Sequence, residues 1–152
     1  MLHGTRCYYA VLEDIWTDYK LAKESYYDTD GKPVLSKAGF ASIEYEYDER
    51  DNCTVQRYYG VDGKPLKGID YGCAVVEYEY DECRNKVRQS CFDAKGNPTD
   101  NDDVIACTEW EYDERGNKIR ESFFGADGKP LESGDGYASV EREYDEDGQK
   151  SE

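Results

Sequence analysis

The chain has 152 residues and a formal net charge of −16, with 35 acidic residues against 19 Lys and Arg. This acidity argues against direct binding to nucleic acid or to an anionic membrane, because both need positive surface. No run of about 18 apolar residues is present, so the sequence predicts no membrane-spanning segment. The first seven residues lack the apolar stretch of a signal peptide, and we therefore expect a cytoplasmic protein.

The first 24 residues carry only a faint copy of the pattern that fills the rest of the chain. Apolar residues in this part follow a spacing that suits a short amphipathic helix. They are Leu12, Ile15, Trp16 and Tyr19. We expect residues 1–24 to form an N-terminal cap or degenerate repeat, with a short helix. Residues 25–152 then form a β-hairpin repeat domain of about four repeats.

One six-residue phrase recurs four times, at intervals of 33, 32 and 32 residues. A second phrase, Asp-Gly-Lys-Pro or a close variant, recurs between these copies. A fixed period of this size is typical of repeat architectures. The copies of the first phrase are EYEYDE from Glu44, EYEYDE from Glu77, EWEYDE from Glu109 and EREYDE from Glu141.

Within each copy, apolar and polar residues alternate. Ala41, Ile43, Tyr45 and Tyr47 share one side of an extended chain, and the intervening residues on the other side are polar or acidic. This period of two predicts a half-buried β-strand with its aromatic side chains directed inward. Arg142 interrupts the aromatic row in the last copy.

Each phrase runs into a turn. The segment 113–116 (Asp-Glu-Arg-Gly) suits a four-residue hairpin loop with Gly116 in the left-handed conformation. That loop length places Glu111 opposite Lys118 and Glu109 opposite Arg120, and it places Glu79 opposite Lys86 in the second copy. Opposite charges then pair across each hairpin. A second turn at 125–128 and the following Pro130 end the return strand. The predicted fold is all-β: tandem antiparallel β-hairpin repeats with a period of 32–33 residues, forming an elongated twisted sheet or a solenoid.

The segment Glu109–Asn117, with looser copies at Tyr47-Asp48 and Tyr80-Asp81, resembles the tyrosine–aspartate (YD) repeats of the Rhs family. YD repeats of that family wind β-hairpins into a large shell around a toxin. The resemblance implies a β-hairpin repeat fold over residues 24–150. It implies no active site, because the YD motif is structural.

The sequence offers few candidate residues for a catalytic site or a metal site. His3 is the only histidine, and no Ser-His or Cys-His pair can form inside the repeat array, so we predict that the protein is not an enzyme. The segment 28–31 (Asp-Thr-Asp-Gly) resembles the start of a calcium loop, but its first ligand is lost in most copies, and a turn is the favoured interpretation. The six cysteines occupy unrelated repeat positions, which favours reduced thiols over a disulfide framework. We expect no metal and no cofactor.

Acidic residues, with Asp48, Asp81 and Asp113 among them, form a grid on the polar side of the repeats. Such a surface suits a basic protein partner, with association that weakens in salt. We predict a non-enzymatic binding protein. The more specific version of this prediction is an inhibitor that mimics nucleic acid and binds a nucleic-acid-handling protein. The alternative is a fragment of a larger surface or toxin-associated array with an adhesive, structural or glycan-binding role, and the exposed edge strand would allow self-association. The predicted partner-binding residues are Glu44, Glu46, Glu77, Glu79, Glu109, Glu111, Glu141 and Glu143.

Overall fold

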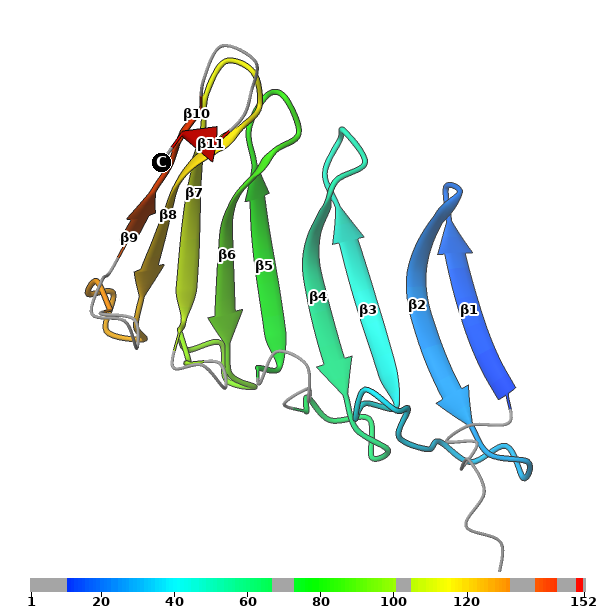
Figure 1. Ribbon diagram of the computed structural model, residues 1–152. Helices are drawn as coiled ribbons and strands as arrows, with labels where there is room; N and C mark the ends of the chain where they lie inside the picture. Colours follow the sequence, from blue (N-terminus) through cyan, green and yellow to red (C-terminus); the bar gives the residue numbers. More distant parts are fainter. Residues whose placement is uncertain (1–10, 67–72, 101–104, 132–138, 145–149, 152) are drawn as a thin grey trace, which may run out of the picture.

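The computed structural model describes residues 11–66, 73–100, 105–131, 139–144 and 150–151. In these residues the protein is all-β and contains no helix, which confirms the predicted fold class. Nine strands form one antiparallel sheet, in which each strand pairs with the next one along the chain. The sheet is twisted and open, and it consists of successive hairpins (Figure 1). A separate two-stranded ribbon follows it.

Odd-numbered strands of the sheet are called forward strands here, and even-numbered strands are called return strands. Each forward strand and the next return strand make one hairpin. The strands are β1 (Val11–Thr17), β2 (Lys20–Tyr27), β3 (Ser42–Tyr47), β4 (Cys53–Tyr59), β5 (Val75–Tyr80), β6 (Lys86–Phe92), β7 (Cys107–Tyr112), β8 (Lys118–Phe124), β9 (Ser139–Glu141), β10 (Glu143–Tyr144) and β11 (Lys150–Ser151).

The prediction of a short N-terminal helix is wrong. The apolar residues that suggested it lie in strand β1 or in the turn that follows β1. β1 pairs with β2 through a two-residue turn at Asp18 and Tyr19, whose φ angles of 49° and 64° are those of a type I′ turn. Four apolar residues at helical spacing are too few to outweigh the pairing offered by a neighbouring strand. β2 runs across residue 24, so the first hairpin continues the sheet.

The predicted four-residue loop is also wrong. The backbone N–H of Asp113 donates to the carbonyl of Asn117 at 2.9 Å, and Gly116 N–H donates to the Asp113 carbonyl at 3.0 Å. This is a three-residue loop, with Gly116 at φ 82°. A β-bulge between Glu111 and Tyr112 then adds one more residue to the offset and places Glu111 opposite Arg120. Before the bulge, Tyr112 pairs with Lys118, one residue from the predicted partner, and Lys118 lies on the face opposite to the predicted one. Beyond the bulge the partners move by two residues, which keeps the predicted faces.

A carboxylate organises each of these loops. The Asp113 Oδ1 atom accepts hydrogen bonds from the N–H groups of Arg115 at 2.9 Å and Asn117 at 2.8 Å, and its Oδ2 atom accepts from the Asn117 side chain at 3.0 Å. Asp48 and Asp81 make the same three bonds in their own loops. Hydrogen bonds to a carboxylate favour its charged form, so the pKa values of these three aspartates lie below the ordinary 3.8, with the asparagine side chain as the largest cause.

This arrangement predicts acid sensitivity of the loops. Because the folded pKa of each aspartate is depressed, its stabilisation is complete above the ordinary value of 3.8 and is lost as the pH falls through the folded pKa. A triple variant with D48N, D81N and D113N is expected to have a lower urea midpoint than the natural protein at neutral pH. That difference should shrink to nothing well below pH 3.8, and a difference that stays constant with pH would contradict the proposed role of the carboxylates.

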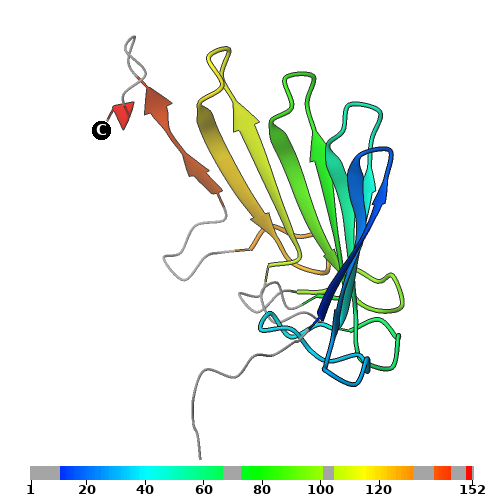
Figure 2. The same cartoon turned by 90° about the vertical axis from the view of Figure 1, so that its right-hand side faces the viewer.

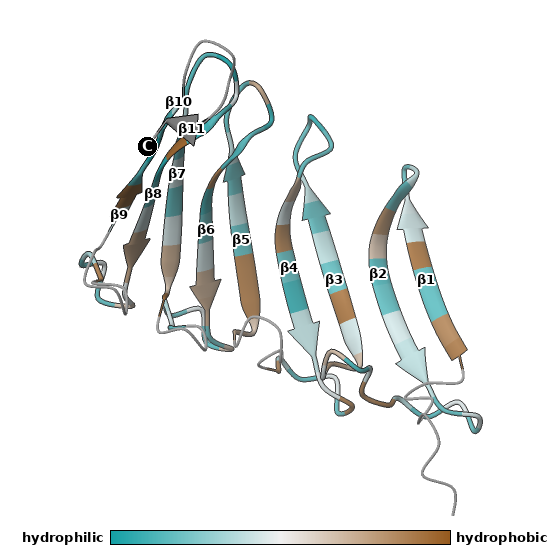
Figure 3. Ribbon diagram, in the orientation of Figure 1, coloured by the Kyte–Doolittle hydropathy of each residue, from teal (hydrophilic) through white to brown (hydrophobic). Residues whose placement is uncertain are grey.

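The core lies at one end of the sheet, where the connectors between hairpins gather (Figure 2). No second sheet covers the strands in the described residues. Figure 3 shows apolar bands in the lower parts of β3 and β5, next to these connectors, and hydrophilic bands above them. Burial of apolar area at this end is the main stabilising term that the structure offers. The buried cluster consists of Phe40, Ile43, Tyr58, Cys73, Val76, Tyr78 and Cys91.

Neighbouring hairpins are joined less extensively than the two strands within a hairpin. β5 and β6 share six residue pairs, but β4 and β5 share three, as do β6 and β7. Beyond those pairs, a tyrosine hydroxyl donates to a carbonyl of the preceding return strand. These bonds join Tyr47 to Leu21 at 2.8 Å, Tyr80 to Cys53 at 2.8 Å, Tyr112 to Lys86 at 2.7 Å and Tyr144 to Lys118 at 2.9 Å. The tyrosine of the YD-like motif therefore links one hairpin to the next.

Candidate partner-binding face

Seven of the eight predicted partner-binding glutamates lie at alternate positions in the forward strands β3, β5, β7 and β9. Strand alternation and antiparallel pairing bring them to one face of the sheet, called here the acidic face. Since return strands separate the forward strands, the acidic rows are about 10 Å apart. The eighth residue, Glu143, is exposed in β10. The acidic face carries Glu44, Glu46, Glu77, Glu79, Glu109, Glu111 and Glu141.

Arginines of the return strands lie between these rows. Arg88 bridges Glu79 at 3.7 Å and Glu109 at 3.8 Å. Arg120 bridges Glu111 and Glu141 in the same way, each at 3.8 Å. The repeated arrangement joins two hairpins through one guanidinium, because its two carboxylate partners come from different forward strands.

The first two hairpins use other cations. Lys23 lies 3.3 Å from Glu44, which also accepts a hydrogen bond from the Tyr59 hydroxyl at 2.9 Å. Arg57 pairs with Glu46. Sequence reasoning chose different partners for Glu79 and Glu111, namely Lys86 and Lys118. Those pairings are wrong, because both lysines lie on the opposite face.

The pairing leaves the carboxylates accessible. The side chains of Glu79 and Glu141 are 66% and 74% exposed. Ion pairs at this exposure contribute between about 0 and 1 kcal/mol, so a partner can displace them at little cost. Within the described residues, Glu77 and Glu143 take part in no ion pair. The acidic face is therefore a lattice of exposed carboxylates with some internal cations.

A hollow of about 220 Å³ opens on this lattice where β6 and β7 stop pairing. Three of the predicted glutamates line it, and Arg88 is the one cation among its lining residues. A lysine or arginine side chain from another protein would meet three carboxylates there. The hollow is lined by Glu79, Val87, Arg88, Glu109, Trp110, Glu111 and Ser122.

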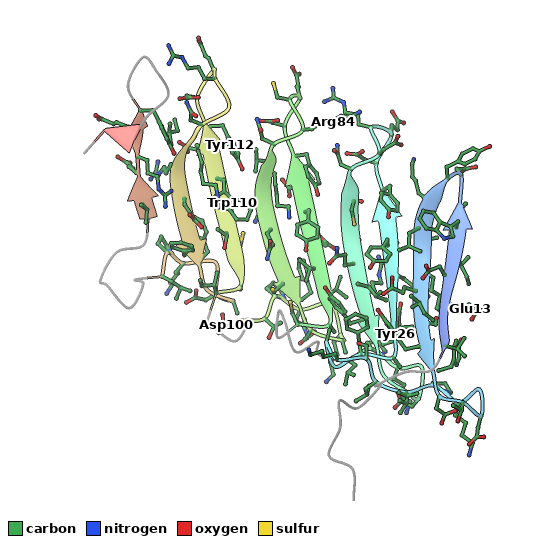
Figure 4. The ribbon with its side chains drawn as sticks, turned by 45° about the vertical axis from the view of Figure 1, so that its right-hand side comes forward. Glu13, Tyr26, Arg84, Asp100, Trp110 and Tyr112 are labelled. Atoms are coloured by element: carbon green, nitrogen blue, oxygen red, sulfur yellow. The ribbon has the colours of Figure 1, made fainter. Side chains whose placement is uncertain are left out.

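The opposite face is called here the aromatic face. Lys86 places its ammonium 3.9 Å from the ring centre of Tyr78, and Lys118 lies 5.1 Å from the ring centre of Trp110. Figure 4 shows Trp110 along β7 with Tyr112 nearer the hairpin tip. Burial raises the pKa of Tyr45 to about 12, which fits a ring that is half removed from water. Away from the connectors these rings are half-buried rather than fully packed.

Other acidic side chains in the connectors have structural roles in the residues that the structure describes. Asp28 accepts hydrogen bonds from the N–H groups of Asp30 at 2.8 Å and Lys32 at 3.0 Å, so it caps a turn. Asp100 accepts one from Ala126 N–H at 2.9 Å. No cluster of three His, Cys, Asp or Glu residues in the described ranges is arranged to hold a metal ion. His3 lies outside the described residues.

Asp48, Asp81 and Asp113 were predicted to extend the acidic grid, but their carboxylates bond to their own hairpin loops instead. Sequence analysis missed the tyrosine bonds between hairpins, although the 32-residue spacing of those tyrosines was a usable signal.

The described residues include no helix of the length and apolarity needed to cross a bilayer.

Comparison with known proteins assigns neither a family nor a function to the chain. The resemblance to YD repeats therefore stays a prediction. No protein-family model matches the chain, and no curated protein matches it either.

Proposed function

We propose that the protein is a non-enzymatic binding protein that takes a basic protein partner on its acidic face. The hollow between β6 and β7 is the observation that carries the proposal, because three exposed carboxylates surround a space open to a cationic side chain. The net charge of −16 adds long-range attraction for such a partner. Extended surfaces of this kind are the usual binding surfaces of repeat proteins.

Glu79, Glu109 and Glu111 would hold a lysine or arginine of the partner. Glu77 adds a carboxylate that pairs with no cation in the part of the chain that the structure describes. Arg88 and Arg120 would lose part of their pairing when the partner binds. Since those pairs are exposed, the exchange costs little free energy. Association should be fast and should weaken as salt rises, because exposed charges are screened within about 10 Å at 0.1 M ionic strength.

The sharper form of the proposal is an inhibitor that imitates nucleic acid. Same-face carboxylates along a strand are roughly 6.5–7 Å apart, which is similar to the spacing of phosphates along a nucleic-acid strand. The arginine rows interrupt this pattern across the strands. A partner that normally binds nucleic acid would therefore contact the acidic rows along the forward strands, and nucleic acid would compete with the protein for it.

The test compares two variants of equal charge. One carries E77Q, E79Q and E111Q on the acidic face. The control carries E49Q, E82Q and E114Q at exposed positions in the hairpin tips. Proteins retained from lysate by the immobilised natural protein are eluted with rising salt, identified, purified and measured against both variants by calorimetry.

We expect the acidic-face variant to bind at least tenfold more weakly than the natural protein, and the control to bind as the natural protein does. Equal loss in both variants would mean that overall charge decides binding and would overturn the proposal. Displacement of the partner by nucleic acid would favour the inhibitor, and no displacement would favour a basic partner of another kind.

A second candidate function has its own observation. A pocket of about 280 Å³ lies at the base of β6, β7 and β8, with Phe92 and Phe124 among its lining residues and Arg88, Ser90 and Glu109 supplying polar groups. Aromatic rings beside hydrogen-bonding groups suit a sugar ring, as an adhesive or glycan-binding array would require. Glycan binding that salt does not weaken, and that F92A and F124A abolish, would favour this function over the first.

A further inference from the structure

We propose that Cys73 and Cys91 form a disulfide that clamps the base of the β5–β6 hairpin. Cys73 lies in the connector just before β5, and Cys91 lies near the end of β6. Both are buried, with exposures of 1% and 3%. In the structure no S–S bond joins them, and the Cys73 thiol donates a hydrogen bond to Cys91 Sγ at 2.7 Å. This distance is shorter than the roughly 3.5–4.0 Å that smaller, non-bonded carbon atoms keep.

The repeat supplies an independent argument. Cys73 and Cys91 occupy two adjoining positions at the base of their repeat, and large side chains fill these positions in the two neighbouring repeats. Phe40 and Tyr58 occupy them in the preceding repeat, with ring centres 5.1 Å apart. In the following repeat these positions hold Ile105 and Phe123.

Two small residues thus replace two large ones in the same repeat, at two positions whose side chains are in contact. A single change of this kind would leave a cavity, and cavities in a buried cluster are destabilising. A covalent bond between the two positions compensates for the lost packing, because it closes the base of the hairpin directly. The remaining described cysteines, Cys53, Cys83 and Cys107, lie at repeat positions without a facing cysteine.

The chemistry requires an oxidant, and a small-molecule disulfide such as oxidised glutathione supplies it. The Cys91 thiolate attacks one glutathione sulfur, the glutathione S–S bond breaks, and the released thiolate takes up a proton. The Cys73 thiol then loses its proton and attacks the Cys91 sulfur of the mixed disulfide, which releases the second glutathione. The protein loses two electrons and two protons, and the oxidised glutathione gains both. A hydrogen bond from Cys73 lowers the pKa of Cys91, which favours Cys91 as the first nucleophile.

The bond would enclose the whole β5–β6 hairpin, including Glu77 and Glu79 of the acidic face. A loop of this length, cross-linked in the unfolded chain, should raise the melting temperature by roughly 6–12 °C. The closed hairpin would also hold its two forward-strand carboxylates in one position. The inference does not depend on the identity of the partner.

The test uses a C83S variant, because Cys73 and Cys83 fall in one tryptic peptide. The protein is equilibrated with oxidised glutathione both in the folded state and during refolding from urea, then alkylated and digested without reductant. We expect a peptide pair joined through Cys73 and Cys91, a mass lower by two hydrogens, and a melting temperature that falls when dithiothreitol is added.

A variant with C73A and C83S should lose this dependence on reductant, while C53S and C83S together should keep it. Alkylation of both Cys73 and Cys91 after both oxidation protocols would overturn the inference. A linkage of either cysteine to Cys53 or Cys107 instead would overturn it as well.

Discussion

Replacing Phe40 by alanine is expected to lower the free energy of unfolding by about 3–5 kcal/mol. Phe40 lies in the connector between β2 and β3 and is 8% exposed. Its ring centre is 5.8 Å from that of Tyr26 and 5.1 Å from that of Tyr58, so it joins the first hairpin to the second. Whole domains are stable by about 5–15 kcal/mol, which makes this loss a large fraction of the total.

Leu35 in the same connector is the matched control, because it is 42% exposed. Its replacement by alanine should change stability by about 0.5 kcal/mol or less. Urea unfolding is followed through Trp16 in β1 and Trp110 in β7, which report on opposite ends of the sheet. Equal losses from the two substitutions would contradict the assignment of the core to the base of the hairpins.

Removing three hydroxyls at once, through Y47F, Y80F and Y112F, is expected to destabilise the protein by about 3 kcal/mol. Each hydroxyl bonds to a carbonyl of the neighbouring hairpin, and one such bond contributes about 0.5–1.5 kcal/mol. The three sites belong to different hairpin junctions, so their effects should add. The rings remain in place, and the loss is therefore attributable to the hydrogen bonds.

Tyr19 provides the control for this variant, because its side chain is fully exposed and Y19F should have no measurable effect. A pH series gives a second measurement. Burial raises the pKa of Tyr47, Tyr80 and Tyr112 above the ordinary 10.0. The stabilisation from the neutral hydroxyls is therefore complete below pH 10.0 and is lost as the pH rises through the folded pKa. The triple variant should lose less stability at high pH than the natural protein, and equal losses would contradict the role assigned to the hydroxyls.

Strand alternation predicted most of the fold, because a period of two determines which side chains share a face whatever the exact pairing. It did not predict the register. The loop after Tyr112 is one residue shorter than expected, which moves the pairing by one residue, and the bulge moves it by one more. A total shift of two residues keeps each side chain on its face, so the two irregularities cancel in the face pattern beyond the bulge. The N-terminal error has a different source, since a short stretch with apolar residues at positions 12, 15 and 16 fits a helix and an exposed edge strand equally well.

The candidate site was predictable in the same limited sense. Alternation placed the forward-strand glutamates on one face correctly. Their cation partners depended on register, so Arg88 and Arg120 stand where Lys86 and Lys118 were expected. The hollow between β6 and β7 could not be predicted, because it arises where two hairpins stop pairing after three residue pairs.

The strict chain order of the sheet makes its length adjustable. Every described strand from β2 to β8 pairs only with the strands before and after it, so no contact depends on the total number of hairpins. Duplicating one 32-residue unit would lengthen the sheet by two strand widths, about 10 Å, while leaving the other junctions unchanged. The length of the sheet can therefore change in steps of one hairpin, by copying or deleting whole units.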